Sequence, residues 1–340
     1  MNETADHNPV APRPCDACGS MNYRPSLIAS DLRVGIAGEF QLLRCATCGL
    51  VSLQPQPSFS ELAPHYPDWL WRAEIDTDHS RNHQKNRALR RKFNVSLQAL
   101  RRCHPQPGAL LDVGCATGDF LQMAQANGWR GRGLEVSQAQ VEAAREAGVE
   151  AEICMDFPAA PLADRYDAVT FNHVLEHVPS PRTYLSKAIG LLKPGGVILV
   201  AVPNFDSLSR RLFGRYWMHL DLPRHLFHFS PRTLSALFAS LDCQILEVGF
   251  HDREQNALGL RNSAKRWLKY GVLRRSVEAS GGETAPSDST PSEIAPRRSG
   301  MALANTVREY SRLASAVTER LGIADTFTIV AAPRRHGRNP

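Results

Sequence analysis

The sequence predicts an α/β fold in which a doubly wound, mostly parallel sheet follows a small cysteine-rich module. Three observations predict it. From residue 109 onward, short apolar segments alternate with segments of helical period, which is typical of a parallel sheet covered by helices on both faces. A glycine-rich loop directly follows the first apolar segment. Near the N-terminus, four of the eight cysteines fall in two C-x-x-C pairs.

Seven segments have the composition of strands, because they are short, apolar or β-branched, and bounded by polar residues or glycine. They are 109–113, 131–135, 150–154, 168–172, 197–202, 243–248 and 325–332. Helices are expected over 119–127, 137–147, 182–192 and 231–241. The residues Lys193-Pro194-Gly195-Gly196 are expected to end the third of these helices, since Pro and Gly commonly follow a helix.

Changes in composition divide the rest of the chain. A basic helix is expected over 81–103, and two amphipathic helices, over 256–274 and 301–321, flank a Ser/Pro/Gly/Glu-rich tract that buries too little apolar surface to stay ordered. The predicted ranges before the sheet are 1–14 for a disordered tail, 15–55 for the cysteine-rich module, and 56–105 for a connecting segment with the basic helix. Residues 106–250 are expected to form the sheet, with a lid over 205–230. The C-terminal part, 251–340, is expected to contain a disordered insert at about 276–299 and a final strand of the sheet at 325–332.

Composition restricts the class of protein. No apolar run reaches the roughly 18 residues that span a bilayer, and the polar N-terminus lacks the apolar stretch of a secretory signal, so we expect a cytoplasmic protein. The net charge of +6 comes mainly from arginine, which favours either a phosphorylated or acidic ligand or merely solvated surface charge. In a reducing compartment, paired cysteines favour metal binding over disulfides.

The loop Asp112-Val113-Gly114-Cys115-Ala116-Thr117-Gly118 lies between an expected strand and an expected helix. Glycine allows the backbone to turn sharply and approach a ligand, and the helix N-terminus adds exposed N–H groups. By itself the loop would suit a dinucleotide equally well. Glu135 ends the next strand, about 20 residues later, where a carboxylate can accept both hydroxyls of a ribose. Asp156 and Phe157 follow the third strand, in position to meet an adenine.

These residues carry a family resemblance. The order D-V-G-C-A-T-G, G-L-E-V-S, D-F, F-N-H-V-L-E-H-V and L-L-K-P-G-G-V-I-L-V-A-V-P-N resembles class I S-adenosylmethionine-dependent methyltransferases across residues 109–205. The resemblance implies a Rossmann-like sheet of seven strands. It also implies that S-adenosylmethionine binds at Asp112, Gly114, Cys115, Gly118, Glu135, Asp156, Phe157 and Asn172, with Asn172 or His173 near the methionine portion. Ala116 departs from the family pattern, which more often has glycine, so we expect slightly altered loop packing.

The two cysteine pairs, Cys15 with Cys18 and Cys45 with Cys48, are each followed by glycine. Four thiolates close the tetrahedral shell of Zn²⁺, so the spacing predicts one structural zinc ion at Cys15, Cys18, Cys45 and Cys48. A zinc ribbon followed by a P-x-P segment and a methyltransferase core resembles a branch that includes sugar C-methyltransferases and enzymes of polysaccharide or secondary-metabolite clusters. This resemblance covers most of residues 15–250.

A second metal pattern is present but rejected. His173-Val-Leu-Glu176-His177 matches the H-x-x-E-H signature of some zinc peptidases, which requires both histidines on one helix face. Here the segment leaves an apolar strand and meets Pro179 and Pro181, which are incompatible with a long helix. The methyltransferase resemblance accounts for the same residues, so we do not expect a peptidase.

Arginine, aromatic and histidine side chains are concentrated in the expected lid, beyond the carboxyl ends of the strands where α/β sheets bind ligands. Methyl transfer to oxygen, nitrogen or activated carbon can need a base, and histidine titrates near neutral pH. The base candidates are His225 and His228, then His173. The alternative for each of them is a packing or capping role.

The leading hypothesis is methyl transfer to a small or mid-sized metabolite, such as a nucleotide-linked sugar or another glycan precursor whose phosphate meets the arginines. One alternative is an O-methyltransferase acting on a lipid or quinone, with the helices at 256–274 and 301–321 in peripheral contact with a membrane. Another is a zinc-ribbon adaptor on a non-catalytic fold. The ribbon has no dense basic stripe with stacking aromatics, which argues against nucleic acid as the partner.

Overall fold

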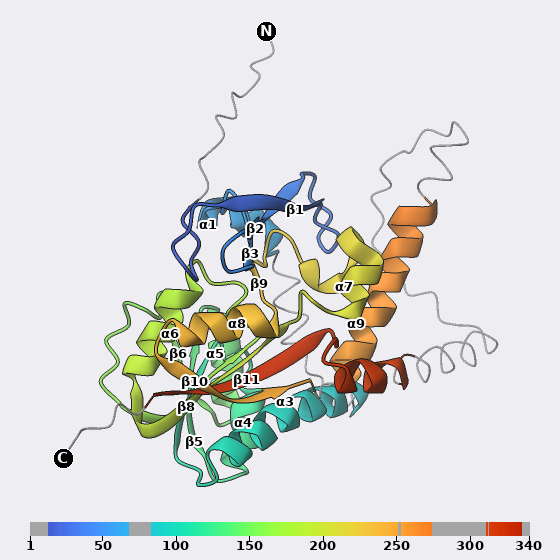
Figure 1. The fold of residues 1–340 in the computed structure, drawn as a ribbon. Helices are drawn as coiled ribbons and strands as arrows, with labels where there is room; N and C mark the ends of the chain where they lie inside the picture. Colours follow the sequence, from blue (N-terminus) through green and yellow to red (C-terminus); the bar gives the residue numbers. More distant parts are fainter. Residues whose placement is uncertain (1–12, 68–82, 251–252, 274–310, 312, 335–340) are drawn as a thin grey trace. The chain divides into compact units, whose positions relative to one another are not determined.

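The computed structural model describes residues 13–67, 83–250, 253–273, 311 and 313–334 (Figure 1). The chain divides into two compact units. The first comprises Met1–Pro203, Asp221–Gly249 and Thr328–Pro340, and the second comprises Asn204–Leu220 and Phe250–Phe327. The expected disordered insert at 276–299 and nearly all of the expected tail lie outside the described residues.

A seven-stranded sheet forms the centre of the first unit, in the order β10-β11-β8-β7-β4-β5-β6 (Figure 1). Strands β4 to β8 pair parallel with one another, and β10 pairs antiparallel with β11. The predicted seven-stranded, mostly parallel fold is therefore confirmed. The strands are β4 (Ala109–Val113), β5 (Arg130–Glu135), β6 (Glu150–Ile153), β7 (Tyr166–Asn172), β8 (Leu192–Pro203), β10 (Cys243–Gly249) and β11 (Thr326–Pro333).

Helices cover both faces of this sheet. Buried side chains of α3 (His83–Cys103), α4 (Asp119–Gln125) and α5 (Gln138–Glu146) form one apolar core with alternate strand residues such as Leu110 and Ala168. On the other face, Phe171 of β7 packs edge-on against Phe157, which also contacts Tyr184 of α6 (Pro181–Gly190). Helix α8 (Pro231–Ala239) packs against β10. The alternation along each strand thus separates two cores.

Local chemistry explains where these helices begin. Ser137, Ser180 and Ser230 are the N-cap residues of α5, α6 and α8, and each accepts a hydrogen bond from a backbone N–H of the first turn. Pro181 and Pro231 follow two of these caps, where proline's missing N–H is not needed. One boundary differs from the prediction. Strand β8 already begins at Leu192, and the Pro-Gly-Gly residues fall within it, beside an irregular register between Tyr166 and Ala168.

The cysteine-bearing module contributes three strands to a second, antiparallel sheet: β1 (Tyr23–Ala29), β2 (Phe40–Cys45) and β3 (Val51–Leu53). Its fourth strand, β9 (Phe227–His228), comes from far later in the chain and pairs with β3 (Figure 1). A short helix α1 (Phe59–Leu62) and a 3-10 turn (Ala63–His65) follow β3. The module is therefore completed by the segment that carries the predicted histidines.

The second unit contains α7 (Leu208–Phe213), two 3-10 turns (Gly214–Tyr216 and Met218–Leu220), α9 (Arg253–Arg266) and a π-helical continuation (Trp267–Leu273). Buried Asp325 accepts hydrogen bonds from Trp217 Nε1 at 2.9 Å and from Ser209 Oγ at 2.8 Å. The segment expected to be one lid, 205–230, is divided between the two units at residue 221. None of the helices in the described part of the chain is long and apolar enough to cross a membrane.

Candidate functional site

The loop after β4 adopts left-handed backbone conformations at three positions. Gly114 has φ 74°, Gly118 has φ 79°, and Ala116 has φ 49°. A side chain at Gly114 would overlap with Val174, and one at Gly118 would lie 3.0 Å from Val149 Cγ2. Ala116 pays the steric penalty of roughly 1–2 kcal/mol that glycine would avoid. The departure from the family pattern therefore falls where the backbone favours glycine, and the loop nevertheless keeps its turn.

Glu135, at the end of β5, is fixed by the backbone around it. Its Oε2 accepts a hydrogen bond from Ala116 N at 3.0 Å, and its Oε1 accepts bonds from Val136 N at 2.7 Å and Ser137 N at 3.1 Å. The residue is only 6% exposed. The carboxylate thus links the glycine loop to the start of α5 and has a defined orientation at the carboxyl edge of the sheet.

Asp112 and Asn172 are brought together on adjacent strands β4 and β7. Asp112 Oδ1 accepts hydrogen bonds from Thr170 Oγ1 at 2.6 Å and from Asn172 Nδ2 at 3.3 Å. Asn172 Oδ1 in turn accepts a bond from Ser96 Oγ of α3 at 3.1 Å. Both residues therefore take part in a network that holds the strand ends and α3 in place. Cys115 is buried next to this network, and burial raises the pKa of its thiol.

At the ends of β5 and β6, the exposed apolar surface comes from residues that the sequence did not single out. Phe157 is 2% exposed and packs against Phe171 and Tyr184. Asp156 is exposed, and its carboxylate accepts a 3.4 Å hydrogen bond from Ala159 N. Val136 and Met155 are 47% and 61% exposed and directly flank Glu135 and Asp156. Their signal in the sequence is their position, because each is a large apolar residue directly beside an expected cofactor residue, Glu135 or Asp156.

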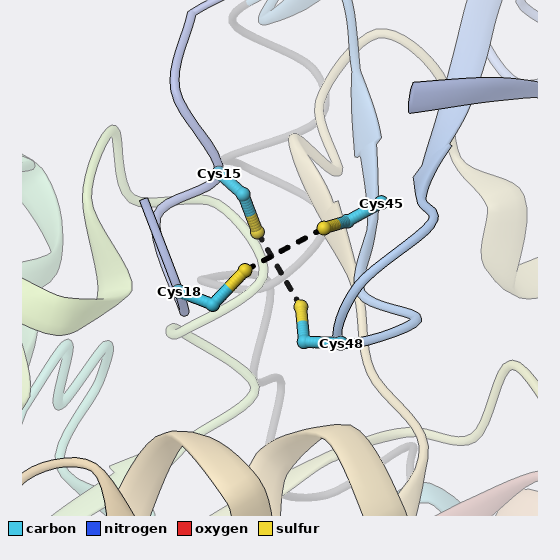
Figure 2. A group of neighbouring side chains, drawn as sticks. All are labelled: Cys15, Cys18, Cys45 and Cys48. Carbon is cyan, nitrogen blue, oxygen red and sulfur yellow. Dashed lines mark hydrogen bonds between the residues drawn. The ribbon is translucent and has the colours of Figure 1, made fainter. Parts of the chain in front are cut away.

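The four paired cysteines converge, as Figure 2 shows. Cys15 Sγ lies 3.5 Å from Cys48 Sγ, and Cys18 Sγ lies 3.6 Å from Cys45 Sγ. Four thiolates at about 2.3 Å from a Zn²⁺ ion would be about 3.8 Å apart, so the spacing fits a tetrahedral site. All eight cysteines belong to the described residues, and each is a free thiol. The donor set and its geometry thus fit a metal ion and not a disulfide pair.

The thiols of this group have divergent acidities. Burial raises the pKa of Cys15, and it raises the pKa of Cys48 to about 11. Burial also opposes ionisation of Cys45, but hydrogen bonds from the backbone N–H groups of Cys48 and Thr47 and contact with Cys18 lower its pKa to about 6. Four adjacent thiols repel one another once ionised, so a bound cation is the simplest way to hold them as thiolates.

The first knuckle is anchored to the start of α6. Asp16 accepts hydrogen bonds from Ser180 Oγ at 2.6 Å and from Arg182 N at 2.7 Å. The guanidinium of Arg182 donates to the backbone carbonyls of Asp16 and Ala17 and to Ser240 Oγ. The cysteine module is therefore fastened to the helical layer at a point distinct from β9.

The segment after β7 gathers histidines around a buried acid. Glu176 lies 3.4 Å from His173 Nδ1, and Glu176, His177 and His225 offer ligand atoms that lie within 4.8 Å of one another. The rings of His177 and His225 meet edge to face at 4.5 Å, and the ring of His228 lies 6.2 Å from that of His225. The three predicted base candidates thus lie in one cluster.

Glu176 is the residue at the centre that the prediction omitted. Burial opposes its ionisation, yet the neighbouring imidazoles of His173, His177 and His225 lower its pKa to about 2. His177 Nδ1 lies 3.0 Å from the carbonyl of Arg224 and 3.3 Å from Tyr66 Oη. Residues 173–180 contain no helix, in agreement with the rejection of a helical peptidase motif. The rejected H-x-x-E-H pattern was nevertheless the signal for Glu176 and His177.

Backbone strain marks the same cluster. His173 has φ 58° and Asp221 has φ 39°, conformations that non-glycine residues seldom adopt and that cost about 1–3 kcal/mol. The carboxylate plus two imidazoles of Glu176, His177 and His225 would also suit a divalent cation. Arg224, in contrast, is 1% exposed and paired with two aspartates, so the structure does not offer its guanidinium to a phosphate.

Residues 81–248 match a family described as a methyltransferase domain. These residues form a methyltransferase domain. They contain the glycine loop, Glu135 and the whole histidine cluster.

One curated relative and two solved structures illustrate what the chain is similar to. A ubiquinone biosynthesis O-methyltransferase of Xanthomonas campestris pv. campestris (strain B100) is 27% identical over 156 residues, which are 42% of this chain and 65% of the relative. A SAM-dependent methyltransferase from Archaeoglobus fulgidus matches 70% of this chain and 93% of its own with a TM-score of 0.43 and 19% identity. SAM-bound amino pentose methyltransferase from Micromonospora echinaspora matches 47% and 85% with a TM-score of 0.37 and 19% identity.

Proposed function

We propose that this protein transfers a methyl group from S-adenosylmethionine to a small-molecule acceptor. The observation that carries the proposal is the proximity of the glycine loop to the residues after β7, which include His173 and Glu176. Val174, between His173 and Leu175, occupies the space that a side chain at Gly114 would fill. The proposed site for the sulfonium donor and the proposed site for the proton-accepting group would therefore adjoin at the carboxyl edge of β4 and β7.

The residues of the loop fit the donor. The left-handed backbone of Gly114 and Gly118 lets the loop turn sharply at the carboxyl edge of the sheet, and the carboxylate of Glu135, fixed at the end of β5, would accept the hydroxyls of the ribose. Asp156, together with the apolar side chains of Val136 and Met155, would hold the adenine. When bound, S-adenosylmethionine supplies an electrophilic methyl group, and the protein has to hold the donor and acceptor in line.

The histidine cluster supplies the base in this proposal. His225, His228 or His173 would accept the proton that the acceptor atom loses when it receives the methyl group. The ionised Glu176 would stabilise the imidazolium that results, as a buried carboxylate does in other histidine-based sites. This assignment would explain why a carboxylic acid, Glu176, is buried among the histidines.

For the acceptor, we propose a nucleotide-linked sugar or another glycan precursor. The support is the resemblance of the ribbon-plus-core arrangement to sugar C-methyltransferases. A quinone-type O-methyl acceptor is the second candidate, because the curated relatives are ubiquinone biosynthesis O-methyltransferases. We also propose that Cys15, Cys18, Cys45 and Cys48 hold one structural Zn²⁺ ion.

A methyl-transfer screen tests the proposal. S-adenosylmethionine with a radiolabelled methyl group is incubated with the full chain and either nucleotide-sugars or catechol-type phenols. Label in the nucleotide-sugar fraction supports the leading acceptor, whereas label only in the phenol fraction favours the quinone-type candidate. Calorimetry with S-adenosylhomocysteine is the parallel measurement. No binding of that product, together with no label in any acceptor, would overturn the proposed activity.

A further inference from the structure

A buried ionic cluster joins the cysteine-bearing module to residues 221–228, which contain His225 and His228 and are called the histidine segment below. Arg224 donates from Nη1 to Asp31 Oδ2 and from Nη2 to Asp31 Oδ1, each at 2.9 Å. Its Nη2 also donates to Asp221 Oδ1 at 2.8 Å, and its Nη1 to the carbonyl of His65 at 3.0 Å. Asp31 and Arg224 are 193 positions apart in the sequence. One fully buried guanidinium thus connects three segments of the chain.

The acidic partners of Arg224 are held in place independently. Asp31 follows β1, and its Oδ1 accepts the backbone N–H groups of Arg33 at 2.9 Å and Val34 at 3.0 Å. His65 Nδ1 lies 2.8 Å from Asp31 Oδ2. Asp221 receives a second cationic partner, because Arg33 Nη1 donates to its Oδ2 at 2.9 Å. We call these three residues the clamp: Asp31 on the cysteine-bearing module, Arg224, and Asp221 beside the histidines.

The histidines are attached directly to this clamp. His225 adjoins Arg224, its backbone N–H donates to Asp221 O at 3.0 Å, and its Nε2 lies 3.9 Å from Asp221 Oδ2. His228 lies in β9, opposite Val51 of β3, and Leu53 N donates to Leu226 O at 2.8 Å. Leu226 and Phe227 also donate their backbone N–H groups to the carbonyl of Glu176. Arg224 therefore belongs to the same short segment as His225 and His228, and its side-chain contacts fix the start of that segment.

Stability alone is a poor explanation for such a cluster. Taking charges out of water offsets much of their mutual attraction, and well-packed apolar residues often stabilise a protein equally well. What a planar guanidinium adds is geometry, because it binds a carboxylate with two parallel hydrogen bonds in one orientation. The strained backbone of Asp221, with φ 39°, also needs surroundings that hold it.

We infer that Arg224 is a positioning residue that locks the histidine segment to the cysteine-bearing sheet and thereby orients His225. The importance of this orientation for turnover rests on the proposed methyl transfer, whereas the clamp itself does not. On that function, the cysteine module would support the acceptor half of the site through the clamp. The donor half, built on the glycine loop and Glu135, has none of its residues in the clamp.

The test compares three single variants of the full chain and the double variant Arg224→Lys/Asp31→Asn. Arg224→Lys keeps the charge but removes the planar fork, and Asp31→Asn keeps the shape but removes the charge of the anchor. Arg182→Lys is the matched control, because Arg182 also fastens the cysteine module to the core and yet does not contact Arg224, Asp221 or the histidines through any of its hydrogen bonds. The probes are ¹⁵N-histidine NMR, with the His225 signals assigned through His225→Gln, and calorimetry with S-adenosylhomocysteine.

The expected result is that Arg224→Lys and Asp31→Asn both shift the side-chain ¹⁵N signals of His225 and leave the affinity for S-adenosylhomocysteine within about twofold of the wild type. The double variant should shift these signals no further than the larger single effect, since both changes open one clamp. Arg182→Lys should leave the His225 signals unchanged.

Wild-type His225 signals in folded Arg224→Lys and Asp31→Asn would overturn the inference, as would an equal shift in Arg182→Lys. If Arg224→Lys does not fold, Asp31→Asn alone decides between these outcomes. A failure of S-adenosylhomocysteine to bind the wild-type chain would count against the proposed function and would leave the NMR comparison intact.

Discussion

Gly114 and Gly148 both have a left-handed backbone, but a side chain would meet different surroundings at each. A methyl group at Gly148, with φ 79°, has nothing within 4 Å, whereas one at Gly114 overlaps with Val174. Gly148→Ala should therefore lower the free energy of unfolding by only the conformational penalty, about 1 kcal/mol. Gly114→Ala should lower it by about 1–3 kcal/mol more, through overpacking. Urea denaturation measures both.

The double variant Gly114→Ala/Val174→Ala provides the check on this explanation. It should recover the overpacking part of the loss and keep the conformational part, because the second substitution removes the atoms that the new methyl group meets. Equal losses in Gly114→Ala and Gly148→Ala would show that Val174 does not crowd the loop.

Glu135→Gln should weaken the binding of S-adenosylmethionine at least tenfold, or ~1.4 kcal/mol. The amide keeps the size of the side chain but loses one acceptor oxygen and the negative charge that a ribose diol would meet. Isothermal titration calorimetry measures the affinity. Glu142→Gln is the matched control, since Glu142 is an exposed residue of the neighbouring α5 whose carboxylate contacts Gln138. Unchanged affinity in Glu135→Gln would remove this residue from the donor site.

The acid at position 31 makes a pH-dependent contribution to stability. Burial opposes ionisation of Asp31, but the hydrogen bonds from Arg224 and His65 lower its pKa from 3.8 to about 2. Because the folded-state pKa lies below the unfolded value, the stabilisation is present above about pH 4 and is lost as the pH falls towards 2. In urea titrations from pH 5 to pH 2, Asp31→Asn should lose this part of the acid dependence. An acid dependence as steep as that of the wild type would contradict the prediction.

At the scale of elements, the segment from Asp221 to His228 carries the next prediction. His225→Ala and His228→Ala should keep the affinity for S-adenosylmethionine, and at least one of them should lower kcat roughly 10²-fold if it removes the base. A group that acts only in the transition state predicts this loss without a matching rise in KM. Raising the assay pH should partly restore the rate of a base variant. Wild-type kcat in both single variants and in the double variant would leave the histidines a packing role.

The cysteine module should contain one equivalent of zinc in protein purified without added metal, as measured by elemental analysis. Cys45→Ser should lose that equivalent and destabilise the four-stranded sheet, because Cys45 ends β2 and β2 pairs with β3. A full equivalent of metal in Cys45→Ser would instead assign the ion to Glu176, His177 and His225, the other group with suitable donors among the described residues. Protein without any metal would contradict the ribbon assignment.

The regular elements were predictable for a physical reason. Strands β4, β8 and β11 of the large sheet contain buried apolar runs, and Ser137, Ser180 and Ser230 are typical N-cap residues that precede the helices. Strand β9 was not predictable, because two residues carry no periodicity and Phe227–His228 becomes a strand only where β3 supplies a partner. When two pairing strands lie so far apart in the chain, the sequence around either strand does not indicate the pairing.

For the site, the residues next to strand ends were predictable and the buried polar partners were not. Glu135 follows from its place after β5, and the histidines follow from their concentration in one segment. The arginines of residues 205–230 were expected to meet a phosphate, but the tertiary structure shows that Arg224 is enclosed by Asp31 and Asp221. An arginine in a loop is ordinarily exposed, so the sequence does not indicate this burial. Glu176 was set aside together with the peptidase pattern that contains it.

At the scale of the whole molecule, the sequence predicts one sheet but not the division into two units. Residues 205–220 are rich in arginine and aromatic side chains, which is equally consistent with a lid and with a packed core. In the structure, Trp217 is 1% exposed and bonded to Asp325, and both belong to the second unit. Burial of an amphipathic aromatic depends on what surrounds it, and this information is not local.

The pairing of β3 with β9 has a consequence for how the chain folds during its synthesis. The cysteine module leaves the ribosome long before β9 does, because β9 lies near position 228. Until then Val51–Leu53, all of them buried in the finished protein, present an unpaired apolar edge, and such edges template aggregation. Non-local pairing of this kind is also slow to form. The growing polypeptide therefore exposes this strand edge until Phe227 and His228 have been synthesised.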